Sequence, residues 1–362
     1  MFIVFRTDSS FKIGVGHVMR CLTLASQLKE MGVRICFITR DHDGNINNLI
    51  VKKGFELISL KKPESFGNDN SKYHKKFNVY NKWLGVSEEE DAAETIISLN
   101  MANPDWVIVD HYALGEKWEI KLCHHVKNIM VIDDLADRHH DCDLLLDQNL
   151  VYNYRGRYKN LLSKKSNLLL GPRYALLDPQ YSKFHKKKLN RSGKIKRVLI
   201  FFGGADQKNL TGLSISTLLK LKKNKILFDI VISEKSIFYS QIKKISKKNK
   251  NIILHDTLPS LAPLIYKSDL AIGAAGSNTW ERCCLALPSI IVISGFNQKK
   301  IAYAMKKAGV AIVLKESSKV KKEIKTAFSL LINDTKLYLK MSKKAFSICD
   351  GEGINRVVKK LL

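Results

Sequence analysis

MFIVFRTDSSFKIGVGHVMRCLTLASQL, residues 1–28, joins a short apolar run to a polar loop and then to a helical pattern that begins behind two glycines. The run FIVF at 2–5 is continuous rather than alternating, as in strands that are buried on both faces of a parallel sheet. In the segment after Gly16, apolar residues recur on one helical face. The stretch therefore predicts the strand, loop and helix that open an α/β domain.

The same alternation of apolar runs and helical patterns continues along the chain and restarts after residue 196. Further strands are predicted at 34–39, 106–110, 128–133 and 143–147, and then at 197–204, 226–233, 251–256, 269–276 and 288–294. Two such series predict an α/β protein with two Rossmann-like, doubly wound domains that face a cleft.

The charged segment 182–196 is poor in apolar residues and is the expected linker between the two domains. The domains are therefore expected at 1–185 and 186–362. By fold analogy, the helical pattern in the final residues, DGEGINRVVKKLL, could cross back to the first domain. The polar stretch 61–91 has little periodicity and is interpreted as an insertion without an assigned role.

The composition is that of an ordinary globular protein, but the net charge is +27. Such a charge raises the question of nucleic-acid binding. The excess is mostly lysine in the second half, arginine is not clustered, and aromatic residues do not alternate with the basic runs. No nucleic-acid partner is therefore expected. The alternative is a lysine-rich solvated surface, which suits a diphosphate substrate.

The seven cysteines are scattered, and no CxxC pair occurs among them. This pattern predicts reduced thiols and a cytoplasmic location. No apolar stretch approaches the roughly twenty residues that span a bilayer, so no membrane association is expected. A monomer is expected.

The loop in front of the first helix does not match the common phosphate-binding loops. A dinucleotide fingerprint needs a third glycine where Met19 stands, and GxxxxGK followed by Ser or Thr does not occur. His17 is then predicted in the first helical turn, at the carboxyl edge of the first strand. A helix N-terminus disfavours the imidazolium and leaves a neutral ring that can accept a proton. His17 is thus a candidate general base, and the alternative is that it only caps the helix.

Other polar residues also follow predicted strands. Asp8, in RTDSS, could orient His17 or bind a sugar hydroxyl, or it could satisfy amides of the loop. DHY at 110–112 and DDLADRHHDCD at 133–143 are rich in Asp and His, which raises a metal site as a possibility. Adjacent histidines point apart on a helix or a strand, and no HxxxH or paired CxxC spacing occurs. No metal is therefore expected.

Two segments of the second half have the pattern of an anion site. FFGGADQKNLT at 201–211 and IGAAGSNTWERCCLALP at 272–288 both run from a strand through glycine into a helix. Backbone N–H groups at such a helix start can bind phosphate. In the second segment Ser277 and Asn278 supply a cap and donors, and Glu281 could hold ribose hydroxyls. The alternative for Glu281 is an acid that favours the helix dipole.

Several motifs together are similar to a known family: RTDSSFKIGVGHVMRCLTLA, IDDLADRHHDCDLLLDQN, LLLGPRYALLDPQY, FFGGADQKNLT and AAGSNTWERCCLALPSIIV. They closely resemble the UDP-2,4-diacetamido-2,4,6-trideoxy-β-L-altropyranose hydrolases of pseudaminic acid biosynthesis. That family is similar to the MurG-type glycosyltransferases of the GT-B fold. The resemblance extends from the first strand to at least residue 300.

The resemblance implies that water attacks the anomeric carbon of a UDP-sugar and releases UDP with inversion, with no cofactor and no metal required. It implies that His17 is the catalytic base, that Tyr112 is an active-site tyrosine and that Glu281 binds ribose. Asp8 is the third catalytic candidate. The candidate substrate-binding residues are Gly14, Gly16, Arg20, Gly203, Gly204, Asn209, Gly276, Ser277, Asn278 and Glu281.

Two other functions remain open at this point. A true GT-B glycosyltransferase would use the same nucleotide sugar but would need a groove for an acceptor. A basic, non-catalytic module that binds polyanions would use the lysine-rich surface instead.

Overall fold

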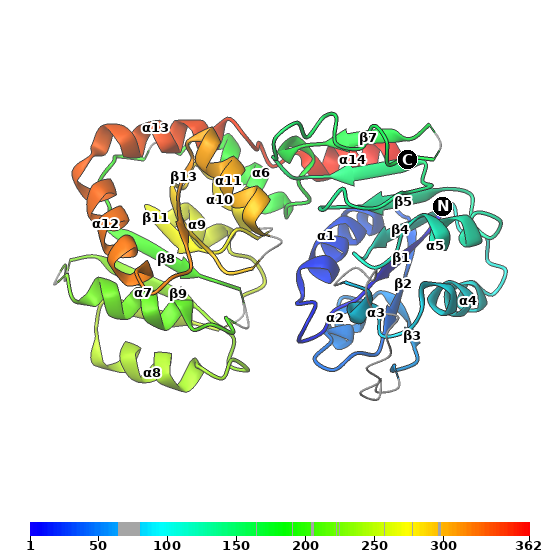
Figure 1. Cartoon of the computed structure of the whole chain (residues 1–362), viewed down its shortest axis with the longest axis horizontal. Coiled ribbons are helices and arrows are strands. Elements are labelled where there is room, and N and C mark those ends of the chain that lie inside the picture. Colours follow the sequence, from blue (N-terminus) through cyan, green and yellow to red (C-terminus); the bar gives the residue numbers. More distant parts are fainter. Residues whose placement is uncertain are drawn as a thin grey trace. The chain divides into compact units, whose positions relative to one another are not determined.

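The computed structural model describes residues 1–63, 80–163, 165–189, 191–203, 206–221, 223, 225–256, 258–276, 278–295 and 298–362. The chain divides into two compact α/β units, each with its own sheet (Figure 1). Unit 1 comprises Met1–Gln148, Asn153–Leu176 and Ile354–Leu362, and unit 2 comprises Asn149–Tyr152 and Leu177–Gly353.

Unit 1 is built on a parallel sheet of seven strands in the order β3-β2-β1-β4-β5-β6-β7. The strands are β1 Phe2–Thr7, β2 Arg34–Arg40, β3 Glu56–Leu60, β4 Trp106–Asp110, β5 Ile129–Ile132, β6 Leu144–Asp147 and β7 Asn167–Leu170. β1 pairs with β2 on one side and with β4 on the other, and Thr7 is the partner of Asp110. The direction of strand order reverses between β1 and β4, which is where doubly wound sheets bind ligands.

Helices cover both faces of this sheet, because alternate side chains of each strand point to opposite faces. The helices are α1 Gly16–Glu30, α2 Asn47–Lys52, α3 Asn81–Leu84, α4 Glu88–Leu99, α5 Glu116–Leu122 and α14 Gly353–Leu361. Ile3 and Phe5 of β1 belong to a core cluster with α1 and α14, whereas Val4 belongs to a cluster with α4 and α5. The C-terminal helix α14 is thus part of unit 1, where Val357 and Leu361 are buried.

Unit 2 repeats the design with a parallel sheet of six strands in the order β10-β9-β8-β11-β12-β13. The strands are β8 Arg197–Phe201, β9 Leu227–Val231, β10 Ile252–His255, β11 Leu270–Gly273, β12 Ser289–Ile293 and β13 Ala311–Lys315. The helices are α6 Pro179–Lys186, α7 Leu210–Leu219, α8 Tyr239–Lys248, α9 Ala262–Lys267, α10 Asn278–Cys284, α11 Lys299–Ala308, α12 Val320–Asn333 and α13 Thr335–Phe346. Strand order reverses between β8 and β11, so the loops after these strands lie at the ligand-binding edge.

Three strands, β3, β7 and β13, lie outside the strand ranges predicted from the sequence and at edges of the two sheets. β3 and β7 are partly exposed, and polar residues such as Glu56 and Asn167 leave them only short apolar runs. β13 differs, because it contains the continuous run AIVL at 311–314 and has the same pattern as the predicted strands.

The segment 182–196, expected as a linker, begins inside a helix. α6 occupies its first residues and packs against α9 and α10, so it belongs to unit 2. The main boundary between the units accordingly lies at Leu177 rather than at residue 186. Of the insertion predicted at 61–91, residues 64–79 lie outside the described residues, and the remainder includes α3 and the start of α4.

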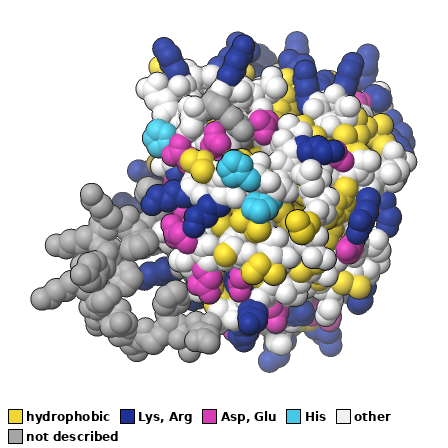
Figure 2. Space-filling model, turned by 90° about the vertical axis from the view of Figure 1, so that its right-hand side faces the viewer, with side chains coloured by type: hydrophobic (Ala, Val, Ile, Leu, Met, Phe, Trp, Pro, Cys, Tyr) yellow, Lys and Arg dark blue, Asp and Glu magenta, His cyan; other side chains and the backbone are white. Residues whose placement is uncertain are grey.

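In the part of the chain that the structure describes, no helix is long and apolar enough to cross a membrane. The face in Figure 2 carries acidic, basic and hydrophobic side chains that are interspersed with one another.

Candidate active site

Five polar side chains meet at the edge of the unit 1 sheet where strand order reverses. His17 and Arg20 come from the first turns of α1, and Asp110 is the last residue of β4. Tyr112 follows β4, and Asp134 follows β5. Loops and helix starts beyond the carboxyl ends of parallel strands therefore supply the whole group.

Asp110 is the centre of this group. It is fully buried, and its Oδ1 lies 2.6 Å from His17 Nδ1. Arg20 donates from Nε to Oδ2 and from Nη2 to Oδ1 of Asp110, both at 2.5 Å. Burial disfavours the carboxylate, but Arg20 and His17 outweigh this effect and hold the pKa of Asp110 well below its usual range. Asp110 is therefore ionised at neutral pH.

An ionised Asp110 fixes the tautomer of neutral His17. Nδ1 carries the proton and donates it to Asp110, so Nε2 keeps its lone pair. Among the described residues, Nε2 has no hydrogen-bond partner, and the side chain is 10% exposed. Val15 is the N-cap of α1 and makes no side-chain cap bond, so the interpretation of His17 as a helix cap is wrong. The arrangement presents a proton acceptor to a ligand.

Tyr112 is held beside His17. Its ring contacts the His17 ring edge-on, with the centroids 4.5 Å apart, and its hydroxyl donates to Asp134 Oδ2 at 2.7 Å. Burial and the Asp134 carboxylate raise the pKa of Tyr112 well above its usual value, so the phenol stays protonated. Arg20 Nη1 lies 2.9 Å from the same Asp134 oxygen. Arg20, predicted to bind substrate, is thus bonded to two carboxylates of unit 1.

Asp8 lies in a separate buried network and does not orient His17. Within the described structure its carboxylate accepts hydrogen bonds from Arg6 at 2.6 and 3.0 Å and from the backbone N–H of Arg40 at 2.7 Å. Asp91 bonds the same two arginines. Burial opposes ionisation of Asp8, but Arg6 holds its pKa far below the usual range. Asp8 therefore joins β1 to β2 and α4, and the structure gives the orienting role to Asp110.

The two glycines of the first loop have different tasks. Gly14 has φ +81°, a backbone conformation that favours glycine, and its N–H donates to Ser10 O. Gly16 is the first residue of α1, and a Cβ built at that position would meet nothing within 4 Å. The space beside the start of α1 is therefore open next to His17.

In unit 2 the start of α7 is capped by its own side chains. Asp206 accepts from the N–H groups of Leu210 and Thr211, and Asn209 accepts from the N–H of Gly212. Asn209, predicted to bind substrate, is therefore the N-cap of α7 in this structure. Because these amides already have acceptors, the start of α7 does not offer them to an anion, contrary to the expectation.

The second predicted anion segment leads into α10. Gly276 accepts a bond from the Thr279 N–H, and Asn278 Oδ1 and Glu281 Oε2 are buried without a hydrogen-bond partner in the described structure. Burial raises the pKa of Glu281 to about 7, against the opposing effect of Tyr181. Among the other predicted residues, Gly203 has φ +97°, whereas Gly204 and Ser277 lie outside the described residues.

The sequence pattern alone does not predict the contacts of Asp110 with His17 and of Asp134 with Tyr112. In the sequence, Asp110 stands within DHY, whose residues suggest a metal site instead. In the described residues no group of three or more His, Cys, Asp and Glu is arranged to hold a metal ion. A signal was present, because an acid at the carboxyl end of a wholly apolar strand such as WVIVD lies at the ligand-binding edge of the sheet.

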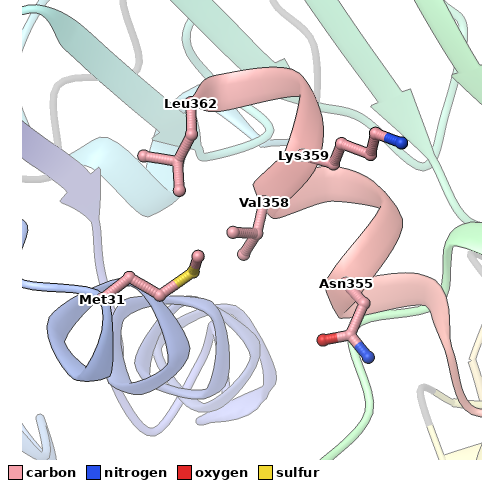
Figure 3. Close-up of a pocket in the computed structure, with 5 residues that line it drawn as sticks. All are labelled: Met31, Asn355, Val358, Lys359 and Leu362. Atoms are coloured by element: carbon pink, nitrogen blue, oxygen red, sulfur yellow. The ribbon is translucent and has the colours of Figure 1, made fainter.

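A hollow of about 390 Å³ lies elsewhere on unit 1. Figure 3 shows the residues that line it, which are Met31, Asn355, Val358, Lys359 and Leu362. Met31 follows the end of α1, whereas His17 stands at its start. A helix of this length extends for roughly 22 Å, so the hollow is separate from the polar group around Asp110.

Comparison with solved structures identifies the fold. MurG of Acinetobacter baumannii superposes with a TM-score of 0.66 at 13% identity, over 99% of this chain and 98% of that one. The chain has a MurG-type fold. Residues 197–357 match the glycosyltransferase family 28 C-terminal domain, so the match begins at β8 and covers most of unit 2.

Sequence relatives confirm the resemblance inferred from the motifs. The chain is 28% identical over 317 residues to the UDP-2,4-diacetamido-2,4,6-trideoxy-β-L-altropyranose hydrolase of Campylobacter jejuni, covering 87% of this chain and 100% of that protein. It is 24% identical over 307 residues to an uncharacterised protein of Methanocaldococcus jannaschii. That alignment covers 83% of this chain, which spans 57% of the length of the archaeal relative.

Proposed function

We propose that this MurG-type protein hydrolyses a UDP-activated 2,4-diacetamido-2,4,6-trideoxy sugar to the free sugar and UDP. The name of the Campylobacter relative supports the substrate class. The observation that carries the proposal is the contact of 2.6 Å between His17 Nδ1 and Asp110, because it leaves Nε2 as a proton acceptor at the ligand-binding edge of unit 1.

The reaction needs one base and a leaving group. In the proposed step a water oxygen forms a bond to the anomeric carbon, and the bond from that carbon to the diphosphate oxygen breaks with its electron pair leaving on UDP. Nε2 of His17 takes one proton of the water, and Asp110 stabilises the imidazolium that forms. The diphosphate is a good leaving group, so an acid at the departing oxygen is not required. Tyr112 positions the His17 ring through the edge-on contact, and its hydroxyl is held by Asp134.

The nucleotide is assigned to unit 2, because residues 197–357, nearly all of them in unit 2, match a glycosyltransferase C-terminal domain. Gly203, Gly276, Asn278 and Glu281 are the described candidates for contact with UDP, and Gly204 and Ser277 are proposed with them from the motifs. Glu281 is the best-supported of these candidates, because its buried Oε2 has no hydrogen-bond partner in the described structure. A ribose hydroxyl would supply that partner.

A glycosyltransferase is the second candidate. The family 28 domain and the likeness to MurG support it as well as they support a hydrolase. In that reaction an acceptor hydroxyl takes the place of water, and the same base would remove its proton. The two functions therefore differ in the nucleophile and share the base.

Release of UDP in the absence of an acceptor separates the candidates. The protein is mixed with the UDP-activated 2,4-diacetamido-2,4,6-trideoxy sugar in metal-free buffer, and free UDP is measured for wild type, His17→Asn and His124→Asn. His124 is an exposed histidine outside the site and serves as the matched control. Loss of general-base assistance predicts a fall of about 10²- to 10⁴-fold for His17→Asn, with unchanged affinity for UDP.

Each outcome assigns the function. UDP release that depends on His17 and needs no acceptor supports the hydrolase, and release only after addition of an acceptor sugar supports the transferase. Release that His17→Asn leaves unchanged contradicts the assignment of the base. Binding to a polyanion without any UDP release would favour the basic binding module.

A further inference from the structure

The ring of Tyr112 is the centre of an aromatic cluster whose other two members, Tyr80 and Trp83, have no role in the proposed reaction. Trp83 stacks on Tyr112 with the centroids 5.6 Å apart and an interplanar angle of 25°. Tyr80 meets Tyr112 edge-on at 5.1 Å and Trp83 edge-on at 4.7 Å. Because Tyr112 also contacts the His17 ring, the aromatic cluster of Tyr80, Trp83 and Tyr112 begins directly beside the candidate base.

The three rings of the cluster are not all buried, as the aromatic rings of a protein core are. Tyr112 is 7% exposed, whereas Tyr80 and Trp83 are only half-buried. The hydroxyl of Tyr112 is turned to Asp134 and Arg20, so polar groups lie on one side of this ring and aromatic surface on the other. A ligand at His17 would therefore meet charged groups and apolar surface at different positions.

Short local structure holds the two outer rings in place. Tyr80 is the N-cap residue of α3, Trp83 lies within this helix, and α3 ends at Gly85 with φ +79°. Leu84 is buried in the core cluster that also contains Trp118. α3 is thus anchored to unit 1 by Leu84 and holds Trp83 against Tyr112.

We infer that Trp83 and Tyr80 form a specificity subsite that accepts the apolar substituents of the sugar, namely an acetamido methyl group or the C6 methyl group. The inference rests on the proposed function. A 2,4-diacetamido-2,4,6-trideoxy sugar carries three methyl groups, whereas N-acetylglucosamine carries one methyl group and has hydroxyls at C4 and C6. Aromatic surface gains free energy by covering methyl groups and loses it by desolvating hydroxyls. The subsite therefore favours the deoxygenated, diacetamido sugar.

The test compares two donors in wild type and Trp83→Ala. We expect Trp83→Ala to lower kcat/KM for the UDP-2,4-diacetamido-2,4,6-trideoxy sugar about tenfold to thirtyfold, mainly through KM. For UDP-N-acetylglucosamine, kcat/KM, or the dissociation constant if this donor is not turned over, should change less than about threefold, because that sugar gains little from the aromatic surface. Trp83→Phe should restore most of the preference. An equal loss for both donors would indicate a structural role for Trp83 and would overturn the inference.

Failure of the proposed function gives a different result from failure of this inference. If wild type releases UDP but Trp83→Ala keeps the full preference, the subsite is wrong and the hydrolase stands. If wild type releases no UDP from either donor, binding of the free diacetamido sugar is measured by isothermal titration calorimetry, which does not depend on the fluorescence of Trp83. Binding that is weakened by Trp83→Ala and not by the exposed control Lys82→Ala would support the subsite, and equal binding by both would refute it.

Discussion

The His17 imidazole depends on a carboxylate that is itself held by an arginine. Asp110 makes bonds of 2.5 and 2.6 Å to Arg20 and His17 while it is fully buried. A buried carboxylate without such partners would be strongly destabilised as an anion. Arg20 therefore acts on His17 through Asp110. His17 and Arg20 lie one turn apart on α1, so their spacing is set locally by the helix.

Asp110→Asn should separate the orientation of the His17 ring from the binding of UDP. The amide keeps the shape of the side chain but is no longer an anion that fixes the Nδ1 proton of His17, so UDP release should fall by about 10³-fold while UDP affinity is unchanged. Steady-state kinetics and UDP titration measure the two quantities. Glu30→Gln, at an exposed position at the far end of α1, is the control. Activity within threefold of wild type would show that Asp110 does not orient the base.

Glu281 should make stability depend on pH. Its pKa is about 7 in the folded protein against an ordinary value of 4.5, so the unfolded chain releases this proton first as pH rises. The contribution of Glu281 to the free energy of unfolding is fully favourable below about pH 4.5 and is lost between pH 4.5 and 7. In Glu281→Gln the side chain does not titrate, so this loss does not occur. Relative to wild type, the variant should gain on the order of 2 kcal/mol at pH 8, or roughly 5 °C in melting temperature, and little at pH 5. Equal differences at both pH values would contradict the raised pKa.

At the scale of elements, α14 is the part of unit 1 that lies farthest along the chain from the others. Its residues Ile354, Val357, Val358 and Leu361 are at most 4% exposed, and Trp106 Nε1 donates to Leu361 O at 3.1 Å. The helix therefore fills an apolar stripe beside α1, although it is separated from the rest of unit 1 by all of unit 2.

Val357→Ala should weaken unit 1. Val357 is completely buried, so removing two methyl groups should lower the free energy of unfolding by about 2 kcal/mol. Thermal unfolding followed by tryptophan fluorescence detects the change, because Trp106 contacts α14. Lys360→Ala, on the exposed side of the same helix, should have little effect. Equal melting temperatures for wild type and Val357→Ala would argue that α14 contributes little to unit 1.

The sequence predicts the helices and strands better than it predicts which of them lie side by side in the fold. Strands that are buried on both faces could be recognised from continuous apolar runs, whereas the edge strands β3 and β7, whose apolar runs are short, could not. His17 could be singled out by its place behind Gly16, but its partner Asp110 is 93 residues away, and their contact depends on the pairing of β1 with β4. Trp83 lies in a stretch without periodicity, so its stacking on Tyr112 could not be inferred.

At the scale of the whole molecule, the charge is divided unequally. Residues 177–353 contain 34 Lys and Arg against 12 Asp and Glu, whereas residues 1–176 contain 24 against 22. Nearly all of the net charge of +27 therefore lies in unit 2, the unit to which UDP is assigned. The sign suits a dianionic diphosphate, and it acts over distances of several ångströms beyond direct contacts.

Salt should consequently weaken substrate capture. Raising NaCl from 50 to 500 mM shortens the screening distance severalfold, so KM for the UDP-sugar should rise about threefold to tenfold while kcat stays within twofold. Initial rates at saturating and limiting substrate measure both. Potassium glutamate at the same ionic strength controls for specific binding of chloride. A KM that is independent of ionic strength would mean that the lysines of unit 2 do not attract the substrate.

The position of α14 at the end of the chain has a consequence for synthesis. On the ribosome, the sheet of unit 1 emerges first, but the apolar stripe that α14 covers stays uncovered while every residue of unit 2 is translated. Unit 2 has its last residue, Gly353, before α14 is released. Domains usually fold in the order in which they are made. Here the unit that is encoded first is completed last, and a chain that ends at residue 353 contains all of unit 2 but leaves the core of unit 1 open.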